Sequence, residues 1–268
     1  PVSAVAEIGV FGEGVVAFST RRGGGVSEGN YASFNANPYC GDEPENVCKN
    51  QELLARFLDI KPSHLVLPHQ VHEAKILRVE ESFFTYSKDE QARLLEGVDA
   101  LYTQLSKTCI AVSTADCVPV LLYDRGTNTV AAIHAGWRGT VKRIVEHTLD
   151  EMVTVVGTRP SDVYAVVGPS ISLASFEVGD EVYEYFAEAG FPMSRLAARF
   201  PAMGVENNLE KWHIDLWEAN CMQLLDKGLS AEHIHVSEIC TYLNDDEFFS
   251  ARKLGIRSGR ILNGIYLK

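Results

Sequence analysis

Apolar runs separated by short polar turns dominate the middle of the chain and predict a series of buried strands. The clearest pair is 118–124 (VPVLLYD) and 129–135 (TVAAIHA), which the turn-forming stretch RGTN connects. Because a short turn between two apolar runs is typical of a hairpin, we expect 118–135 to form one. Further strands are predicted at 14–20, 64–68, 74–80, 109–114, 163–169, near 233–238 and at 261–268.

Helical periodicity is strongest in the segment that follows this hairpin. Gly157 suits the C-terminal end of the expected helix, and Pro160 prevents its continuation. Its apolar residues recur every three or four positions, as in a helix packed on a sheet: Val141, Ile144, Val145, Leu149, Met152, Val153 and Val156.

A second helix is predicted from Asp42 to about Leu58. Asp42 and Glu45 match a D-x-x-E helix start, and Pro44 suits the first turn. Two more helices are expected at about 179–189 and 213–227. Strands in runs with helices between them favour an α/β fold with a mixed sheet over a strict βαβ series. No repeat or linker is evident, so we expect 1–268 to form a single domain.

Composition narrows the class of protein. The chain has 268 residues, of which 46% are hydrophobic and 22% charged, as is usual for globular proteins. Its net charge of −12 argues against broad binding to nucleic acid or to an anionic membrane. We find no signal-peptide pattern near the start and no apolar stretch of about 18 residues. The cysteines are scattered, which favours a reduced, cytoplasmic protein (Cys40, Cys48, Cys109, Cys117, Cys221 and Cys240). The oligomeric state is left open between a monomer and a homodimer.

Ligand-type side chains lie at the ends of three predicted strands. Cys117 precedes the strand at 118–124, His134 ends the strand at 129–135, and HQVH contains His69 and His72. Residues three apart in an extended chain point to opposite faces, so these two histidines do not chelate one ion unless the chain turns. One His, one Cys and one His would leave an open fourth position, as catalytic zinc requires. Zinc there would lower the pKa of a bound water to about 7.

Two other interpretations of these side chains stay open. Cys117 could be a nucleophile with His134 as its base and a carboxylate that orients the histidine. Alternatively, a lone cysteine is often a small buried apolar residue, and His134 could be a hydrogen-bonded histidine without chemistry. Neighbouring Asp116 could carry a proton, hydrogen-bond a metal-bound histidine, or only shape a turn.

Eight motifs occur along the chain in a characteristic order: STRRGGGVSEGNYASFN, GDEPENV, HQVH, GVDAL, STADCVPVLL, AAIHAGWRGT, VGPSISLASFEVG and FFSARKLGIRSGR. In these motifs, and over nearly its whole length, the chain resembles the YfiH family. That family is also known as the multicopper polyphenol oxidase laccase-domain family and as zinc-dependent purine nucleoside phosphorylases.

The resemblance implies one α/β domain, with mixed sheets and flanking helices in a layered sandwich. It implies zinc held by His72, Cys117 and His134. It also implies phosphorolysis of adenosine, inosine, guanosine and methylthioadenosine, together with deamination of adenosine. Arginine is the natural clamp for phosphate because its planar guanidinium binds two oxygens at once. The candidate substrate-binding residues are Arg22, Asn35, Gln70, Arg138, Arg252 and Arg260.

Other functions compete with this expectation. A multicopper oxidase needs about ten copper-binding histidines in several HxH pairs, whereas this chain has eight histidines and one such pair, His233 and His235. Copper is therefore expected only as an adventitious substitute for zinc, at the same site. A hydrolase that edits muramoyl-peptide precursors through Cys117 is the main alternative. A non-enzymatic protein-binding role is the third.

Overall fold

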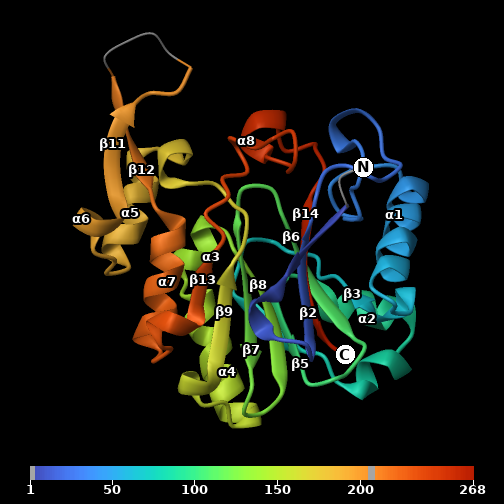
Figure 1. Cartoon of the computed structure of the whole chain (residues 1–268). Helices are drawn as coiled ribbons and strands as arrows, with labels where there is room; N and C mark the ends of the chain where they lie inside the picture. Colours follow the sequence, from blue (N-terminus) through green and yellow to red (C-terminus); the bar gives the residue numbers. More distant parts are fainter. Residues whose placement is uncertain (1–3, 205–208) are drawn as a thin grey trace.

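The computed structural model describes residues 4–204 and 209–268, and their helices and strands form stacked layers (Figure 1). The strands are β1 (Val5–Ile8), β2 (Val15–Thr20), β3 (Leu65–Val66), β4 (Lys75–Arg78), β5 (Val98–Thr103), β6 (Cys109–Thr114), β7 (Val118–Asp124), β8 (Thr129–Ala135), β9 (Val163–Val167), β10 (Glu177–Val178), β11 (Ala197–Pro201), β12 (Glu210–Ile214), β13 (Ile234–Val236) and β14 (Ile261–Leu267). The helices are α1 (Pro44–Phe57), α2 (Lys88–Leu95), α3 (Trp137–Val141), α4 (Ile144–Val156), α5 (Asp180–Glu188), α6 (Met193–Leu196), α7 (Leu216–Asp226) and α8 (Ala251–Leu254).

The described residues contain a six-stranded sheet in the order β13-β9-β7-β8-β5-β4. Its β7 and β8 form the predicted antiparallel hairpin, with Val118 opposite Ala135 and Asp124 opposite Thr129. On its other edge, β8 pairs antiparallel with β5. Every side chain of β8 is buried, because both faces of this sheet are covered.

A second sheet, in the order β1-β2-β14-β6-β3, packs face to face against the first. The core between the two sheets is made of apolar residues at alternate positions of the facing strands. Leu101, Leu121 and Ala132 come from the six-stranded sheet, and Val112 and Ile265 come from the second sheet. Removing these side chains from water is the main force that holds the two sheets together.

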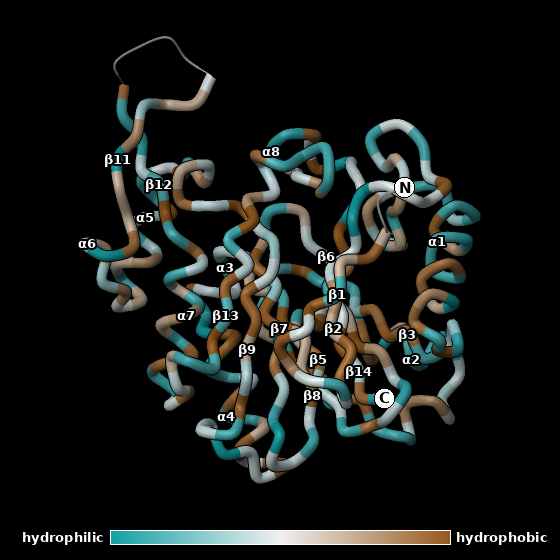
Figure 2. The backbone as a smooth tube through the Cα atoms, in the orientation of Figure 1, coloured by the Kyte–Doolittle hydropathy of each residue, from teal (hydrophilic) through white to brown (hydrophobic). Residues whose placement is uncertain are grey.

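Helices cover the outer faces of both sheets. Ile144 and Leu149 of α4 pack with Val120 on the six-stranded sheet, while Leu54 of α1 packs with Phe18 on the second sheet. Figure 1 shows the resulting order of helix, sheet, sheet and helix. In Figure 2 the hydrophobic segments concentrate in the central strands. The predicted α/β class, with mixed sheets and flanking helices in a layered sandwich, is confirmed.

A small third sheet, β10-β12-β11, lies at one side of the molecule with α5 and α6 (left in Figure 1). The sequence pattern did not predict it, because its strands are partly exposed and lack a continuous apolar run. His213, expected at the start of a helix, belongs to β12. The helix α7 begins three residues later, where the Asp215 side chain accepts a hydrogen bond from the Glu218 N–H.

The predicted helix after the hairpin is two helices, α3 and α4. Arg143 separates them, because its φ of 58° lies in the left-handed region that interrupts a helix. Gly157 ends α4 in the same left-handed conformation, as predicted.

The start of α1 differs from the D-x-x-E prediction. Pro44 occupies the first turn as expected, but the capping residue is Glu43, whose side chain makes no capping hydrogen bond. The carboxylate of Asp42 instead accepts hydrogen bonds from Ser27 and Asn35. Across 4–204 and 209–268, no helix combines the length and apolar composition needed to cross a bilayer.

A substitution at Gly264 tests how closely β14 packs against its neighbours β2 and β6. A Cβ at this position would lie 2.5 Å from Cζ of the buried Phe18 and 3.2 Å from Cβ of Ala111. We therefore expect Gly264→Ala to lower the free energy of unfolding by about 1–3 kcal/mol, measured by urea titration. Gly14→Ala is the control, since a Cβ there meets nothing within 4 Å. Equal stability of the two variants would contradict this packing.

Candidate metal centre

The inter-sheet faces of three neighbouring strands end in polar residues at one end of the six-stranded sheet. Along β8, Val130 and Ala132 face the core between the sheets, so His134 faces the same side. Asp99 lies two residues before Leu101 in β5, and Cys117 lies four residues before Leu121 of β7. Each polar residue therefore points to the same face as its apolar partner, toward the space between the sheets. Because Leu101 pairs with Ala132, the antiparallel register continues to place Asp99 opposite His134.

The fourth residue of the site, His72, comes from the loop between β3 and β4. His72 has a φ of 64°, so the chain turns sharply at this residue. Gln70 fastens the loop to β6, since its side-chain amide donates to the Ser113 carbonyl (2.9 Å) and accepts from the Ser113 N–H (2.7 Å). The two histidines of HQVH have different partners. The Nδ1 atom of His69 pairs with Glu96 at 2.8 Å, and only His72 joins the group of metal donors.

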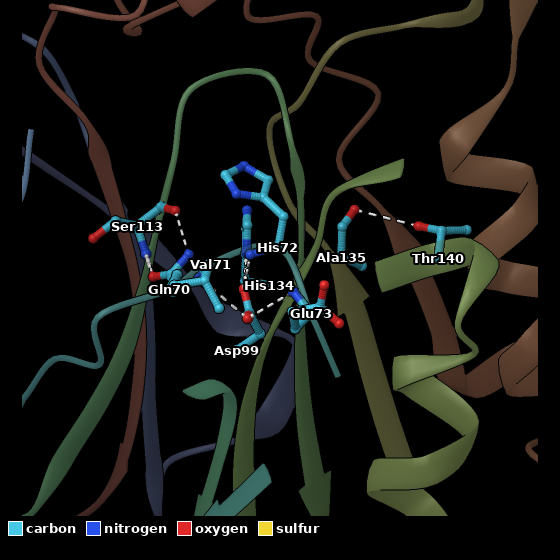
Figure 3. A network of polar contacts seen from close by, with 9 residues as sticks. All are labelled: Gln70, Val71, His72, Glu73, Asp99, Ser113, His134, Ala135 and Thr140. Atoms are coloured by element: carbon cyan, nitrogen blue, oxygen red, sulfur yellow. Dashed lines mark hydrogen bonds and ion pairs between the residues drawn. The ribbon is translucent and has the colours of Figure 1, made fainter. Parts of the chain in front are cut away.

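Asp99 joins this loop to the end of β8. Its carboxylate is fully buried and accepts hydrogen bonds from the backbone N–H groups of Val71 (3.3 Å), His72 (3.1 Å) and Glu73 (2.9 Å). The Nδ1 atom of His134 lies 2.7 Å from the same carboxylate. Figure 3 shows Asp99 beneath both histidine rings.

His72, Cys117 and His134 converge on one point. One ligand atom of each lies within 4.8 Å of the other two, and the two imidazole centroids are 4.8 Å apart at an interplanar angle of 76°. A Cβ added to Gly136 would lie 3.0 Å from Cys117 Sγ and 3.2 Å from a carbon of His72, so only glycine leaves this space open. Tetrahedral Zn²⁺ needs ligand atoms roughly 3.5 Å apart, which small side-chain movements here would provide. The residues therefore fit a metal ion.

Neighbouring groups change the protonation of the Cys117 thiol. Burial alone would raise the pKa of the Cys117 thiol, but the charge of His134 and hydrogen bonds from both imidazoles lower this pKa to about 6. Burial also opposes protonation of His134, whereas the Cys117 thiolate and Asp99 raise its pKa to about 9. Burial of Asp99 is outweighed by hydrogen bonds from His134 and the backbone, which lower its pKa. Cys117 therefore favours the thiolate form, which is the form that binds metals.

A cavity of about 480 Å³ opens beside the three donors. Two of the predicted substrate-binding residues, Gln70 and Arg260, line it. The guanidinium of Arg260 donates to the carbonyls of Ile256, Ser258 and Gly259, so it also holds the loop after α8 in place. Arg257 lines the cavity too, and this exposed guanidinium has no hydrogen-bond or ion-pair partner among the described residues.

Two other predicted binding residues, Asn35 and Arg22, make hydrogen bonds within loops and do not line the cavity. Asn35 is fully buried, donates to Asp42 at 2.9 Å and accepts the Arg260 N–H at 3.1 Å. Arg22 donates to the carbonyls of Ala32 and Asp245. Neither lines the 480 Å³ cavity, so contact of either side chain with a substrate stays a prediction.

Asp116 and Arg252 line a neighbouring hollow with Phe176. The Asp116 carboxylate accepts hydrogen bonds from Thr241 Oγ1 and the Arg252 N–H, both at 2.7 Å. It therefore fixes the loop that carries α8, and the carboxylate that contacts His134 is Asp99. A proton-carrying role for Asp116 stays a prediction.

Arg138 borders a third hollow, where its guanidinium stacks 4.3 Å from the Trp137 ring. Glu73 and Lys142 line the same hollow and form an ion pair with each other. Arg138 is thus separated from the cavity beside the three donors, and a phosphate contact for it stays a prediction.

Sequence reasoning missed Asp99 and two residues that line the cavity, Arg257 and Tyr39. Asp99 is the one charged side chain in β5, whose six residues are all buried, and this isolated charge in a buried strand was an available signal. Arg257 had no comparable signal, because several arginines lie near the C-terminus and only the folded loop shows which of them faces the cavity.

Comparison with known proteins gives a consistent result over most of the chain. Residues 15–268 match the family model described as multi-copper polyphenol oxidoreductase laccase. A purine nucleoside phosphorylase of Bacteroides thetaiotaomicron is 52% identical over 93% of this chain and 90% of its own length. Adenosine deaminase RL5, from an unknown prokaryotic organism, is 43% identical over 96% and 95%. The crystal structure of YlmD from Geobacillus stearothermophilus aligns with a TM-score of 0.89 at 33% identity, over 100% of this chain and 97% of that one.

Removing any one donor tests the three-residue centre. We expect His72→Ala, Cys117→Ala and His134→Ala each to lose most of the bound metal, measured per chain by plasma mass spectrometry, because two donors hold an ion far more weakly than three. Cys221→Ala is the matched control, since this buried cysteine lies in α7, in the apolar core on the outer face of the six-stranded sheet. Full metal content in Cys117→Ala would contradict the assignment.

Proposed function

Because this chain belongs to the multi-copper polyphenol oxidoreductase laccase family, as the resemblance to the YfiH family indicated, we propose that it is a zinc-dependent purine nucleoside phosphorylase that also deaminates adenosine. Its proposed substrates are adenosine, inosine, guanosine and methylthioadenosine. The observation that carries this proposal is the cavity in which the three metal donors face an unpaired guanidinium and a stacked aromatic pair.

Phosphorolysis requires a bound phosphate beside the ribose. An oxygen of phosphate forms a bond to C1′ while the bond from C1′ to the purine nitrogen breaks, which gives ribose 1-phosphate and the free base. The chain carries a net charge of −12, so a phosphate dianion needs local positive charge. Arg257 supplies it at the cavity wall, with both guanidinium edges free for phosphate oxygens. Arg260 adds positive charge beside it.

The purine base needs a flat apolar contact. Tyr39 and His69 stack at the cavity wall with ring centroids 4.3 Å apart and planes 19° apart, and Glu96 holds the imidazole of His69 through Nδ1. Tyr39 is 45% exposed, so this ring keeps surface available for a further stacked ring. Stacking of a base on an aromatic side chain contributes about 1–3 kcal/mol.

The metal would be held by His72, Cys117 and His134, and when bound it would supply a Lewis acid and lower the pKa of a bound water. The chain's own residues exclude bulk water beneath this point, because Asp99 and His134 are almost completely buried. The open side of the three donors faces the cavity, where a nucleoside can approach. The same placement suits attack of water on C6 of adenine, with ammonia as the leaving group.

A thiol-dependent hydrolase is the second candidate, and one observation favours it. Cys117, His134 and Asp99 form a chain of hydrogen-bonded side chains, with a thiol pKa of about 6, as in Cys–His–carboxylate enzymes. Such an enzyme would cleave an amide, for example in a muramoyl peptide. It would keep its activity after chelation of the metal, whereas the proposed phosphorylase would lose it.

The first test is phosphate dependence. Purified protein of known zinc content is incubated with inosine or adenosine, with and without inorganic phosphate, and the products are separated by liquid chromatography. We expect hypoxanthine or adenine only with phosphate, and ammonia from adenosine without it. Absence of both products in zinc-loaded protein, with turnover of a muramoyl peptide, would replace the proposal with the second candidate.

Two variants should separate the two substrate contacts. We expect Arg257→Ala to raise the KM for phosphate about tenfold or more, because a charge-assisted hydrogen bond contributes roughly 1.5–3 kcal/mol, and to leave the KM for inosine nearly unchanged. Tyr39→Ala should raise the KM for inosine, because the base loses its stacking contact, and leave the KM for phosphate nearly unchanged. Arg93→Ala, an exposed arginine on α2, is the control. Equal changes of both KM values in both variants would contradict these contacts.

A further inference from the structure

Asp99 has every hydrogen-bonding position of its carboxylate occupied by protein. One oxygen accepts the His72 N–H and contacts His134 Nδ1, and the other accepts the N–H groups of Val71 and Glu73. The residue has no exposed surface and does not line the cavity, so it meets no substrate. Its effects must therefore pass through the residues that it contacts.

Those contacts reach two of the three metal donors from two different segments. His134 is held by its ring, and His72 is held by its backbone in a left-handed turn that non-glycine residues adopt only when neighbouring contacts fix it. A single oxygen of Asp99 makes both contacts (Figure 3). Movement of this carboxylate would displace both histidines at once.

We propose that Asp99 is the positioning residue of the metal centre. Its carboxylate keeps a proton on His134 Nδ1, which leaves Nε2 as the ring nitrogen that can release its proton and bind a metal. At the same time it closes the 71–73 turn that brings His72 over the site. The inference depends on the proposed metal centre but not on which reaction the enzyme performs.

The substitution Asp99→Asn tests this role with little change of shape. When the amide oxygen accepts the Val71 and Glu73 N–H groups, the amide nitrogen faces the His72 N–H and His134 Nδ1. This nitrogen is a donor and has no electron pair for either proton. Hydrogen bonding from the amide to Nδ1 would move the histidine proton to Nε2, which blocks that atom as a ligand. We expect the affinity for Zn²⁺ to fall about 10- to 100-fold, measured by competition with a chromophoric chelator.

The control is Asp124→Asn, which also removes a fully buried carboxylate. Asp124 accepts hydrogen bonds from Gly126 and Thr127 in the β7–β8 turn, away from the three donors. We expect this variant to bind Zn²⁺ as the unmodified chain does, even where its thermal stability falls. Equal Zn²⁺ affinity in Asp99→Asn and the unmodified chain would overturn the inference. Absence of Zn²⁺ binding by the unmodified chain would instead overturn the proposed metal centre.

A measurement on the unmodified chain covers the case in which Asp99→Asn does not fold. Nitrogen NMR of the ¹⁵N-histidine-labelled, Zn²⁺-loaded protein reports which ring nitrogen carries a proton. We expect the resonances of His134, assigned by their loss in His134→Gln, to show a protonated Nδ1 and a metal-bound Nε2. A proton on Nε2, or metal on Nδ1, would overturn the inference.

Discussion

A carboxylate that is buried between two sheets is stable only when hydrogen bonds replace the water that it has lost. At the start of β5, Asp99 meets this requirement with three backbone N–H groups of one loop and the imidazole of His134. The hydrogen bonds that this buried charge requires therefore fix the position of the 71–73 loop and of His134 near the end of β8, and with them two of the metal donors. The metal centre and the cavity wall both depend on this junction.

The layered fold makes the junction possible. The two sheets pack through apolar residues at alternate strand positions. At one end of the six-stranded sheet, the same alternation places the side chains of Asp99, Cys117 and His134 between the two sheets. Because that space is closed below by the apolar core and open above to the cavity, charge effects among these groups are strong while small molecules can still enter. This accounts for the lowered thiol pKa of Cys117 and for the raised pKa of His134.

The sequence was informative where the physical signal is local. The strands at 109–114, 118–124 and 129–135 have the predicted bounds, because continuous apolar runs end at clear polar turns. The strand β5 was missed because Asp99 interrupts its apolar pattern, although that interruption marks the centre of the site. The break between α3 and α4 was also hidden, since Arg143 continues a helical pattern and only its backbone conformation stops the helix. Which arginine faces the cavity depends on loop contacts that no spacing encodes.

The central claim is that His72, Cys117 and His134 bind one metal ion together, with an open position toward the cavity. X-ray absorption at the zinc edge of the purified, full-length chain tests it most directly, because this method counts nitrogen and sulfur neighbours at the metal. The account predicts two nitrogen neighbours at about 2.0 Å, one sulfur at about 2.3 Å and one further light atom. A shell without sulfur, or one with several sulfurs, would contradict it.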